Sequence, residues 1–115
     1  YNYKSIFLKR DNINDVEEDD VIPEEFNLMQ NYPNPFNPST TIRFSLPQEA
    51  KVNIKVYNIL GKEITELLNE TRRSGEYEIN WDGTELNGKL VPSGIYFITM
   101  IADRFSETIK TMLMK

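Results

Sequence analysis

Catalytic chemistry has few side chains to draw on in this sequence, because its 115 residues include neither histidine nor cysteine. Without them the chain cannot build a Ser-His-Asp triad, a thiol nucleophile, a histidine general base, or a zinc site with nitrogen or sulfur ligands. Glu76 and Glu78 could suggest a pair of glycosidase carboxylates, but they stand at positions i and i+2 of a predicted strand and both point into solvent. We therefore expect no enzymatic activity.

One group of oxygen-bearing side chains could suggest a cation site. Asp82 follows Trp81, and Glu85 and Asn87 come shortly after it. Calcium needs about six to eight oxygen ligands, and the Asp82-Gly83 pair is already explained as a tight turn. We expect no metal and no cofactor, and Trp81 is interpreted as a core residue.

The net charge of −5 is confined to the start of the chain. Residues 1–10 carry three basic side chains, residues 11–25 carry eight acidic and no basic ones, and residues 26–115 hold ten of each sign. The body of the chain thus has no global field that would attract a polyanion, and we expect no nucleic-acid partner. No apolar run approaches the roughly 20 residues of a membrane-spanning helix, so we expect no direct membrane insertion.

The length suits one compact domain, and the acidic stretch precedes it. Like charges at this density repel one another and carry too little apolar area to offset the entropy of ordering, so residues 11–23 are interpreted as an acidic linker. Residues 1–10, which begin YNYKSIFL, are either the end of an upstream domain or a flexible arm. The folded domain is predicted over residues 24–115.

Short alternating apolar runs separated by turn residues fill that domain. The run at 62–68 also fits helical spacing, but a hairpin-like turn at 58–61, with Gly61 at its end, favours a strand. The run at 95–102 is apolar on both faces, which is typical of a central strand. With the further strands predicted at 42–46, 52–57, 76–81 and 105–115, the pattern indicates an antiparallel β-sandwich of about seven strands.

The least usual segment is NYPNPFNPSTT at residues 31–41. Each of its prolines fixes its own φ and biases the preceding residue toward extended backbone, while asparagine side chains cap the intervening turns. We interpret the segment as a stiff entry loop into the strand at 42–46, with Phe36 packed as a plug against the sandwich. Loops of this stiffness serve structural and recognition roles alike.

Several blocks, in order, resemble one known family. They are FNLMQNYPNPFNPSTTIRFSLP at 26–47, KVNIKVYNILGKEI at 51–64, INWDGTELNG and KLVPSGIYFITM at 79–100, and ETIKTMLMK at 107–115. Together they are similar to the type A C-terminal sorting domains of the type IX secretion system in Bacteroidota and their relatives. The 79–100 part is also similar to the Ig-like domain of flagellar hook-cap proteins. Both resemblances imply an Ig-like β-sandwich.

The resemblance to sorting domains implies that the chain is a transport address. Such domains are exported to the periplasm by a separate signal and then led across the outer membrane by a shuttle and a translocon. A sortase-like peptidase at the cell surface commonly removes them, and the passenger is anchored or released. The matched positions here are Pro33, Asn34, Pro35, Gly61, Gly75, Gly94, Tyr96, Lys110 and Lys115.

By the same resemblance, cleavage would fall in the linker between Asp15 and Glu25. Within it, the positions expected at or near the cut are Asp19, Asp20, Val21 and Glu24. No fixed cleavage motif is readable in this stretch.

The last strand gives a physical reason for such a role. A free edge along residues 105–114 would present backbone groups that a receptor could extend by strand addition, while Lys110 and Lys115 would oppose self-pairing. Met112 and Met114, if exposed, would suit adaptable contacts. The alternative is that this strand merely completes the sandwich.

Two other functions stay open at this point. An accessory binding module, for carbohydrate for example, would need a groove of exposed aromatics, for which Tyr32 and Tyr57 are candidates. An Ig-like structural assembly domain would oligomerise as its concentration rises, whereas we expect a sorting domain to be a monomer.

Overall fold

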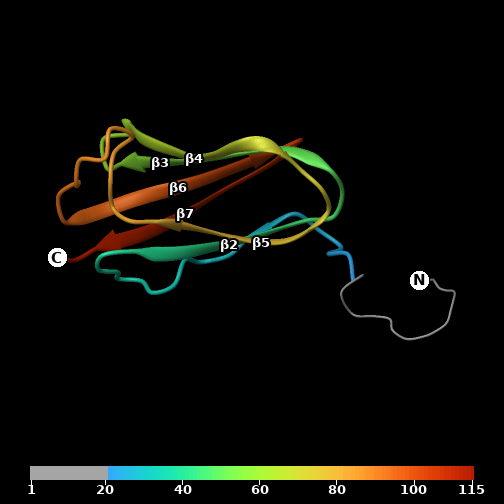
Figure 1. Ribbon diagram of the computed structural model, residues 1–115, viewed down its shortest axis with the longest axis horizontal. Helices are drawn as coiled ribbons and strands as arrows, with labels where there is room; N and C mark the ends of the chain where they lie inside the picture. The colour runs from blue at the N-terminus through green and yellow to red at the C-terminus, as the bar shows by residue number, and fades with distance from the viewer. Residues whose placement is uncertain (1–20) are drawn as a thin grey trace, which may run out of the picture.

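The structure of the chain, a computed structural model, describes residues 21–115, which form two antiparallel β-sheets packed face to face (Figure 1). The strands are β1 (Asn27–Leu28), β2 (Thr40–Leu46), β3 (Ala50–Asn58), β4 (Glu63–Arg72), β5 (Gly75–Trp81), β6 (Gly94–Ala102) and β7 (Phe105–Leu113). The smaller sheet has the order β1-β2-β5 and the larger one the order β4-β3-β6-β7. The predicted all-β, Ig-like sandwich is confirmed. No helix within residues 21–115 is long and apolar enough to cross a membrane.

Alternation in the sequence determines which face of each strand is buried. In β3, Val52, Ile54 and Val56 are fully buried, and the residues between them are partly exposed. In β5, Trp81 is buried whereas the two glutamates stay in solvent. The remaining large core side chains come from both sheets and are Ile42, Phe44, Leu46, Ile98, Met100 and Leu113.

The predicted strands are all present. The run at 62–68 is a strand, β4, and its hairpin with β3 turns where Gly61, at φ +85°, donates its N–H to the carbonyl of Asn58 at 2.9 Å. The sequence pattern did not predict β1, because two residues are too few to show alternation.

The predicted central position of β6, between β3 and β7, is confirmed, although only one of its two apolar faces is buried. Its inward residues are buried, whereas Ile101 on the outward face is 47% exposed and Phe97 is partly exposed. Within residues 21–115, nothing packs over the outer face of the larger sheet, so the apolar run reflects a central strand in a two-layered sandwich.

The strand directions separate two ends of the sandwich. One end carries Val21 and the start of β1, together with the turn between β6 and β7. The other end carries the loop between β1 and β2, the turn between β3 and β4, residues 82–93 and the C-terminus (Figure 1, left). We call these the linker end and the terminal end.

Candidate functional site

At the terminal end, the entry loop lies along the outer edge of the last strand. Phe36 forms a parallel bridge with Leu113. Its N–H donates to the carbonyl of Met112 at 2.9 Å, and its own carbonyl accepts from the N–H of Met114 at 3.0 Å. The loop therefore pairs with β7 as a short extra strand would.

Two side chains of the same loop extend this contact. Gln30 Nε2 donates to the carbonyl of Lys110 at 2.8 Å, and Asn34 Oδ1 accepts from the N–H of Met112 at 3.0 Å. Asn34 Nδ2 also approaches the Lys110 carbonyl, at 3.4 Å. We call residues 30–36 the clasp, because they occupy the edge of β7 from Lys110 to its C-terminal end.

The clasp overturns part of the expectation for the last strand. β7 is an edge strand, as predicted, but it ends at Leu113, and its carboxyl half is not free. Within residues 21–115, the outward backbone groups of Ser106 and Thr108 lack a partner, and so does the N–H of Lys110, whose carbonyl accepts from Gln30. A receptor strand could not add along the carboxyl half without first displacing the clasp.

A buried asparagine holds the clasp in place. Asn31 is 2% exposed, and its Nδ2 donates to Thr40 Oγ1 at 2.9 Å and to Thr111 Oγ1 at 2.6 Å. Its Oδ1 accepts from Gln30 Nε2 at 2.7 Å. Both threonine side chains are buried, and Thr40 Oγ1 in turn donates to the carbonyl of Pro33 at 2.9 Å. One amide thus links the loop, β2 and β7. Leaving this amide or the two threonine hydroxyls buried without hydrogen-bond partners would lower the stability of the folded domain.

A cluster of three aromatic side chains in the core anchors the clasp. Phe36 is 2% exposed, and its ring centroid lies 5.4 Å from that of Trp81. Trp81 meets Tyr96 edge to face at 5.3 Å, and its Nε1 donates to the carbonyl of Thr84 at 3.0 Å. The expectations that Phe36 is a plug and Trp81 a core residue are both confirmed.

Tyr96, one of the predicted recognition residues, has a raised pKa. Burial raises its pKa above the ordinary 10.0, and the negative charge of Glu85 raises it further. Its hydroxyl donates to the carbonyl of Pro92 at 2.6 Å, an arrangement that requires the neutral phenol. Tyr96 therefore lies in the core, 5% exposed, and offers little surface to a partner.

The structure brings all seven predicted recognition residues to the terminal end. Pro33, Asn34 and Pro35 are in the clasp, and Tyr96 lies in the aromatic cluster that anchors the clasp. Gly94 begins β6 opposite Leu113, and Lys110 is exposed on β7. Lys115 lies beyond β7, contrary to the prediction that it belongs to the last strand, and its N–H donates to Ser93 Oγ at 3.0 Å.

The predicted cleavage region lies at the linker end. Val21 is 74% exposed and Glu24 is also exposed. Asp19 and Asp20, like the rest of residues 1–20, are outside the described residues. The recognition residues and the described part of the cleavage region are therefore at opposite ends of the sandwich.

Sequence reasoning missed the residues that hold the clasp together, Gln30, Asn31 and Thr111. Asn31 was interpreted only as part of a loop whose asparagines cap turns. Its partner Thr111 is 80 positions away, so no local pattern reveals the contact. The available signal was Thr111 alone, a polar residue at a position that the alternation of the last strand assigns to buried surface.

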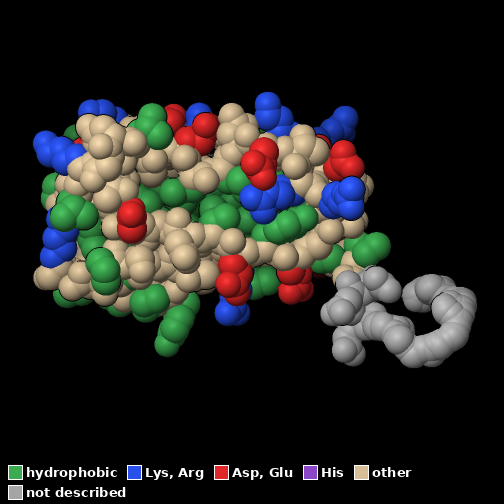
Figure 2. Space-filling model, in the orientation of Figure 1, with side chains coloured by type: hydrophobic (Ala, Val, Ile, Leu, Met, Phe, Trp, Pro, Cys, Tyr) green, Lys and Arg blue, Asp and Glu red, His purple; other side chains and the backbone are tan. Residues whose placement is uncertain are grey.

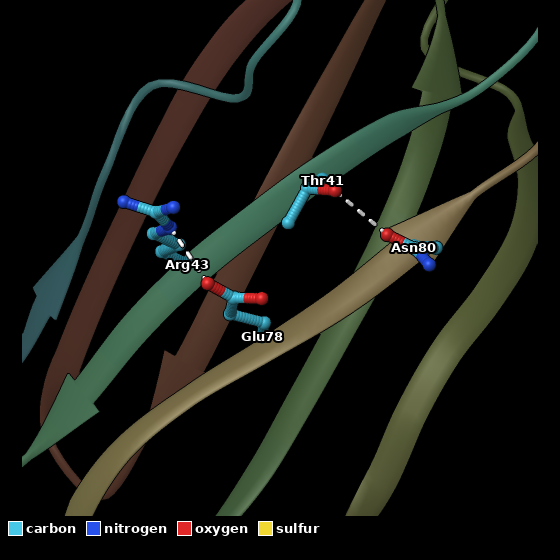
Figure 3. A network of polar contacts seen from close by, with 4 residues as sticks. All are labelled: Thr41, Arg43, Glu78 and Asn80. Carbon is cyan, nitrogen blue, oxygen red and sulfur yellow. Dashed lines mark hydrogen bonds and ion pairs between the residues drawn. The ribbon is translucent and has the colours of Figure 1, made fainter.

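Other surfaces give less reason to expect a ligand. On the outer face of the smaller sheet, Thr41 and Asn80 are hydrogen-bonded at 2.8 Å, and Arg43 and Glu78 form an ion pair at 2.9 Å (Figure 3). Both side chains of the ion pair are mostly exposed, so the pair contributes little to the stability of the fold. Within residues 21–115, no three acidic side chains form a group that could hold a metal ion.

The two aromatic candidates for a carbohydrate-binding groove come from different parts of the fold. Tyr32 is 80% exposed in the clasp, whereas Tyr57 is partly buried near the end of β3 in the larger sheet. They do not share a strand or a sheet, so they form no aromatic stripe.

Comparison with known families places this fold. The profile of the FlgD Ig-like domain matches residues 34–105, more than half of the chain. The chain belongs to this family. The FlgD Ig-like match starts inside the clasp and ends at the first residue of β7. Asn31, Thr111 and Lys110 therefore lie outside it.

Two solved structures resemble the FlgD Ig-like domain described here. FlgD from Xanthomonas campestris, whose structure was described in connection with the hook capping essential for flagellar assembly, superposes with a TM-score of 0.51 at 22% identity over 79% of this chain and 63% of its own. PorZ from Porphyromonas gingivalis, described as a surface component of the type IX secretion system, gives a TM-score of 0.52 at 20% identity. That match covers 78% of this chain but 11% of PorZ. At these identities the likeness concerns the fold, and no curated protein matches the chain.

Proposed function

We propose that this chain is a C-terminal sorting domain that directs a passenger protein across the outer membrane by the type IX secretion system. Its partners would be an outer-membrane shuttle, the translocon and a sortase-like peptidase that cuts in the acidic linker. It would act as a monomer without catalytic activity or cofactor, first in the periplasm and then at the cell surface or in the medium.

The observation that carries this proposal is the clasp on β7. Residues 30–36 and 110–114 are joined by hydrogen bonds into one surface. Asn31 and Thr111, which hold that surface together, fall outside the segment shared with FlgD Ig-like domains. The ordered sequence blocks that resemble sorting domains include both parts of this surface.

The contacts favour recognition of a folded surface over strand addition. The backbone edge of β7 is already paired with the clasp near its C-terminal end. What remains accessible there are side chains: Lys110, Met112 at 37% exposure, Met114 at 55% and Tyr32 at 80%. Flexible thioethers beside a cation and an aromatic ring suit a partner's irregular surface.

The test is export of a fluorescent reporter fused to residues 11–115 and carrying a separate signal peptide. It is expressed in a bacterium with and without its type IX translocon. We expect surface or medium fluorescence only when the translocon is present. Retention in the periplasm of both strains would refute the sorting function.

A pair of matched variants then tests the clasp surface. Lys110→Ser with Met112→Ser removes one lysine and one exposed apolar side chain beside the clasp. Lys51→Ser with Ile101→Ser removes the same kinds of side chain from the outer face of the same sheet toward the linker end. We expect export to fall only in the first variant, while both keep the wild-type melting temperature.

Membership of the FlgD Ig-like family supports a second candidate, a structural assembly domain. Such a domain would form oligomers in a concentration-dependent way. Sedimentation of the full chain at increasing concentration separates the two candidates, because the sorting function predicts a monomer throughout.

A further inference from the structure

Two tight turns at the terminal end display large apolar side chains in solvent. Ile59 and Leu60, in the turn between β3 and β4, are 68% and 88% exposed. Leu86 and Leu90, in the loop that leads into β6, are 81% and 61% exposed. In Figure 2, hydrophobic side chains reach the surface at this end, on the left of the view. Turns normally carry polar residues at such positions, so four apolar ones call for an explanation.

The first turn is held rigidly. The side-chain oxygen of Asn58 accepts from the N–H groups of Leu60 at 2.9 Å and Lys62 at 3.0 Å. The backbone of Asn58 also pairs with Gly61 and Lys62, each at 2.9 Å. Four hydrogen bonds fix five residues, so Ile59 and Leu60 are presented in one backbone conformation.

The second turn is built in a similar way. The N–H of Glu85 donates to the carbonyl of Lys89 at 2.8 Å, and that of Gly88 donates to the carbonyl of Glu85 at 2.9 Å. Asn87 Oδ1 accepts from the N–H of Lys89 at 2.9 Å, as Asn58 does in the first turn. Leu86 therefore stands on a small hydrogen-bonded hairpin. A turn whose backbone is fixed in advance loses little backbone entropy on binding, which favours its apolar side chains as interface anchors.

Cationic side chains flank both turns. Lys62 follows Leu60, and Lys89 precedes Leu90; within residues 21–115 neither forms an ion pair. Lys110 and Lys115, at the same end, form none there either. A partner that accepts the leucines would therefore gain by placing carboxylates opposite these lysines.

We infer that the turns at 58–62 and 85–89 form a second contact surface for the export shuttle, with Leu60 and Leu86 inserted into an apolar cleft whose rim is acidic. The inference rests on the proposed sorting function and deepens it. The clasp surface and these two turns then contact one partner from the same end of the sandwich.

A protein cleft fits the observations better than a lipid surface. The rigid turns fix the direction of each leucine, which a fluid bilayer does not need.

The experiment measures binding of the full chain to the purified outer-membrane shuttle of a type IX system in detergent. The test variant is Leu60→Ser with Leu86→Ser, and the matched control is Ile101→Ser, which removes an exposed apolar side chain near the linker end. Vesicles of phosphatidylethanolamine and phosphatidylglycerol serve as the lipid probe. The melting temperature of the double variant should match the wild type, because Leu60 and Leu86 are largely exposed. Ile101 is about half exposed, so the melting temperature of the control is measured alongside to show that it stays folded.

We expect the double variant to bind the shuttle at least about tenfold more weakly, and the control to bind as the wild type does. Equal binding of the double variant, with wild-type binding intact, would overturn this inference and leave the sorting function standing. Vesicle binding that the double variant loses would assign the turns to lipid instead. Absence of wild-type binding together with absence of translocon-dependent export would remove the sorting function, and this inference with it.

Discussion

Replacement of Asn31 by alanine is the sharpest test of how the clasp is held. The asparagine amide is buried and donates to Thr40 and Thr111, which belong to different sheets. Alanine removes both hydrogen bonds, leaves two buried hydroxyls with one fewer partner each, and opens a small void between β2 and β7. Asn31→Asp keeps the shape but places a charge that cannot donate, so it should be at least as harmful.

The magnitude follows from the number of bonds lost. Each buried hydrogen bond contributes about 1 kcal/mol, and the desolvated groups left behind add to this loss. We therefore expect Asn31→Ala to lower the free energy of unfolding by about 2 to 4 kcal/mol. For a domain of this size, that corresponds to a drop in melting temperature of roughly 10 to 25 °C.

Denaturant unfolding of the full chain measures this loss, with Asn80→Ala as the matched control. Asn80 is an exposed asparagine whose bond to Thr41 lies on the surface, so its removal should change stability by less than about 0.5 kcal/mol. Hydrogen exchange adds a local readout: the N–H groups of Met112 and Met114 should exchange faster in Asn31→Ala. Stability within about 0.5 kcal/mol of wild type, with these two amides still protected, would refute the role assigned to Asn31.

Three further substitutions test the core and the turns. Trp81→Ala should cost about 3 to 5 kcal/mol in unfolding free energy; a small change in melting temperature would place this side chain outside the core. The raised pKa of Tyr96 means that the folded state favours the neutral phenol. The contribution of Tyr96 to the free energy of unfolding is therefore complete below the ordinary pKa of 10.0 and is lost as the pH rises through the raised pKa. The wild type should therefore lose more stability than Tyr96→Phe as the pH rises above 10.0, and parallel losses would contradict the shift. Gly83→Ala should lower the melting temperature more than Gly61→Ala. Both glycines have positive φ, but only at Gly83 would the new Cβ lie 3.3 Å from Leu113. Equal melting temperatures would show that the Leu113 side chain moves aside without cost.

The fold was readable from the sequence because its main signals are local. Val52, Ile54 and Val56 alternate over consecutive residues, and Asn58 with Gly61 defines a hairpin turn within a single short segment. Such patterns depend on the two-residue period of strands and on the conformational freedom of glycine. β6 was placed centrally for the same reason, although its outward face proved to be uncovered.

The candidate site was readable only in part. The prolines of the entry loop predicted a stiff segment, and Phe36 was predicted to pack against the sandwich. Nothing nearby in the sequence specified which residues they cover. The decisive contacts join Asn31 to Thr111 and Phe36 to Met112, across most of the length of the domain. Because they depend on how the two sheets meet, the carboxyl half of β7 was predicted free when it is paired.

Under the sorting function proposed above, the opposite placement of the two ends has a consequence for the size of the passenger. β7 has nine residues, so at about 3.3 Å per residue the sandwich sets the exposed linker at Val21 about 30 Å from the tips of the terminal end. A passenger attached at Val21 would extend away from whatever the tips contact. Its bulk would then not crowd that contact, and one small domain could serve passengers of very different dimensions without change to its own sequence.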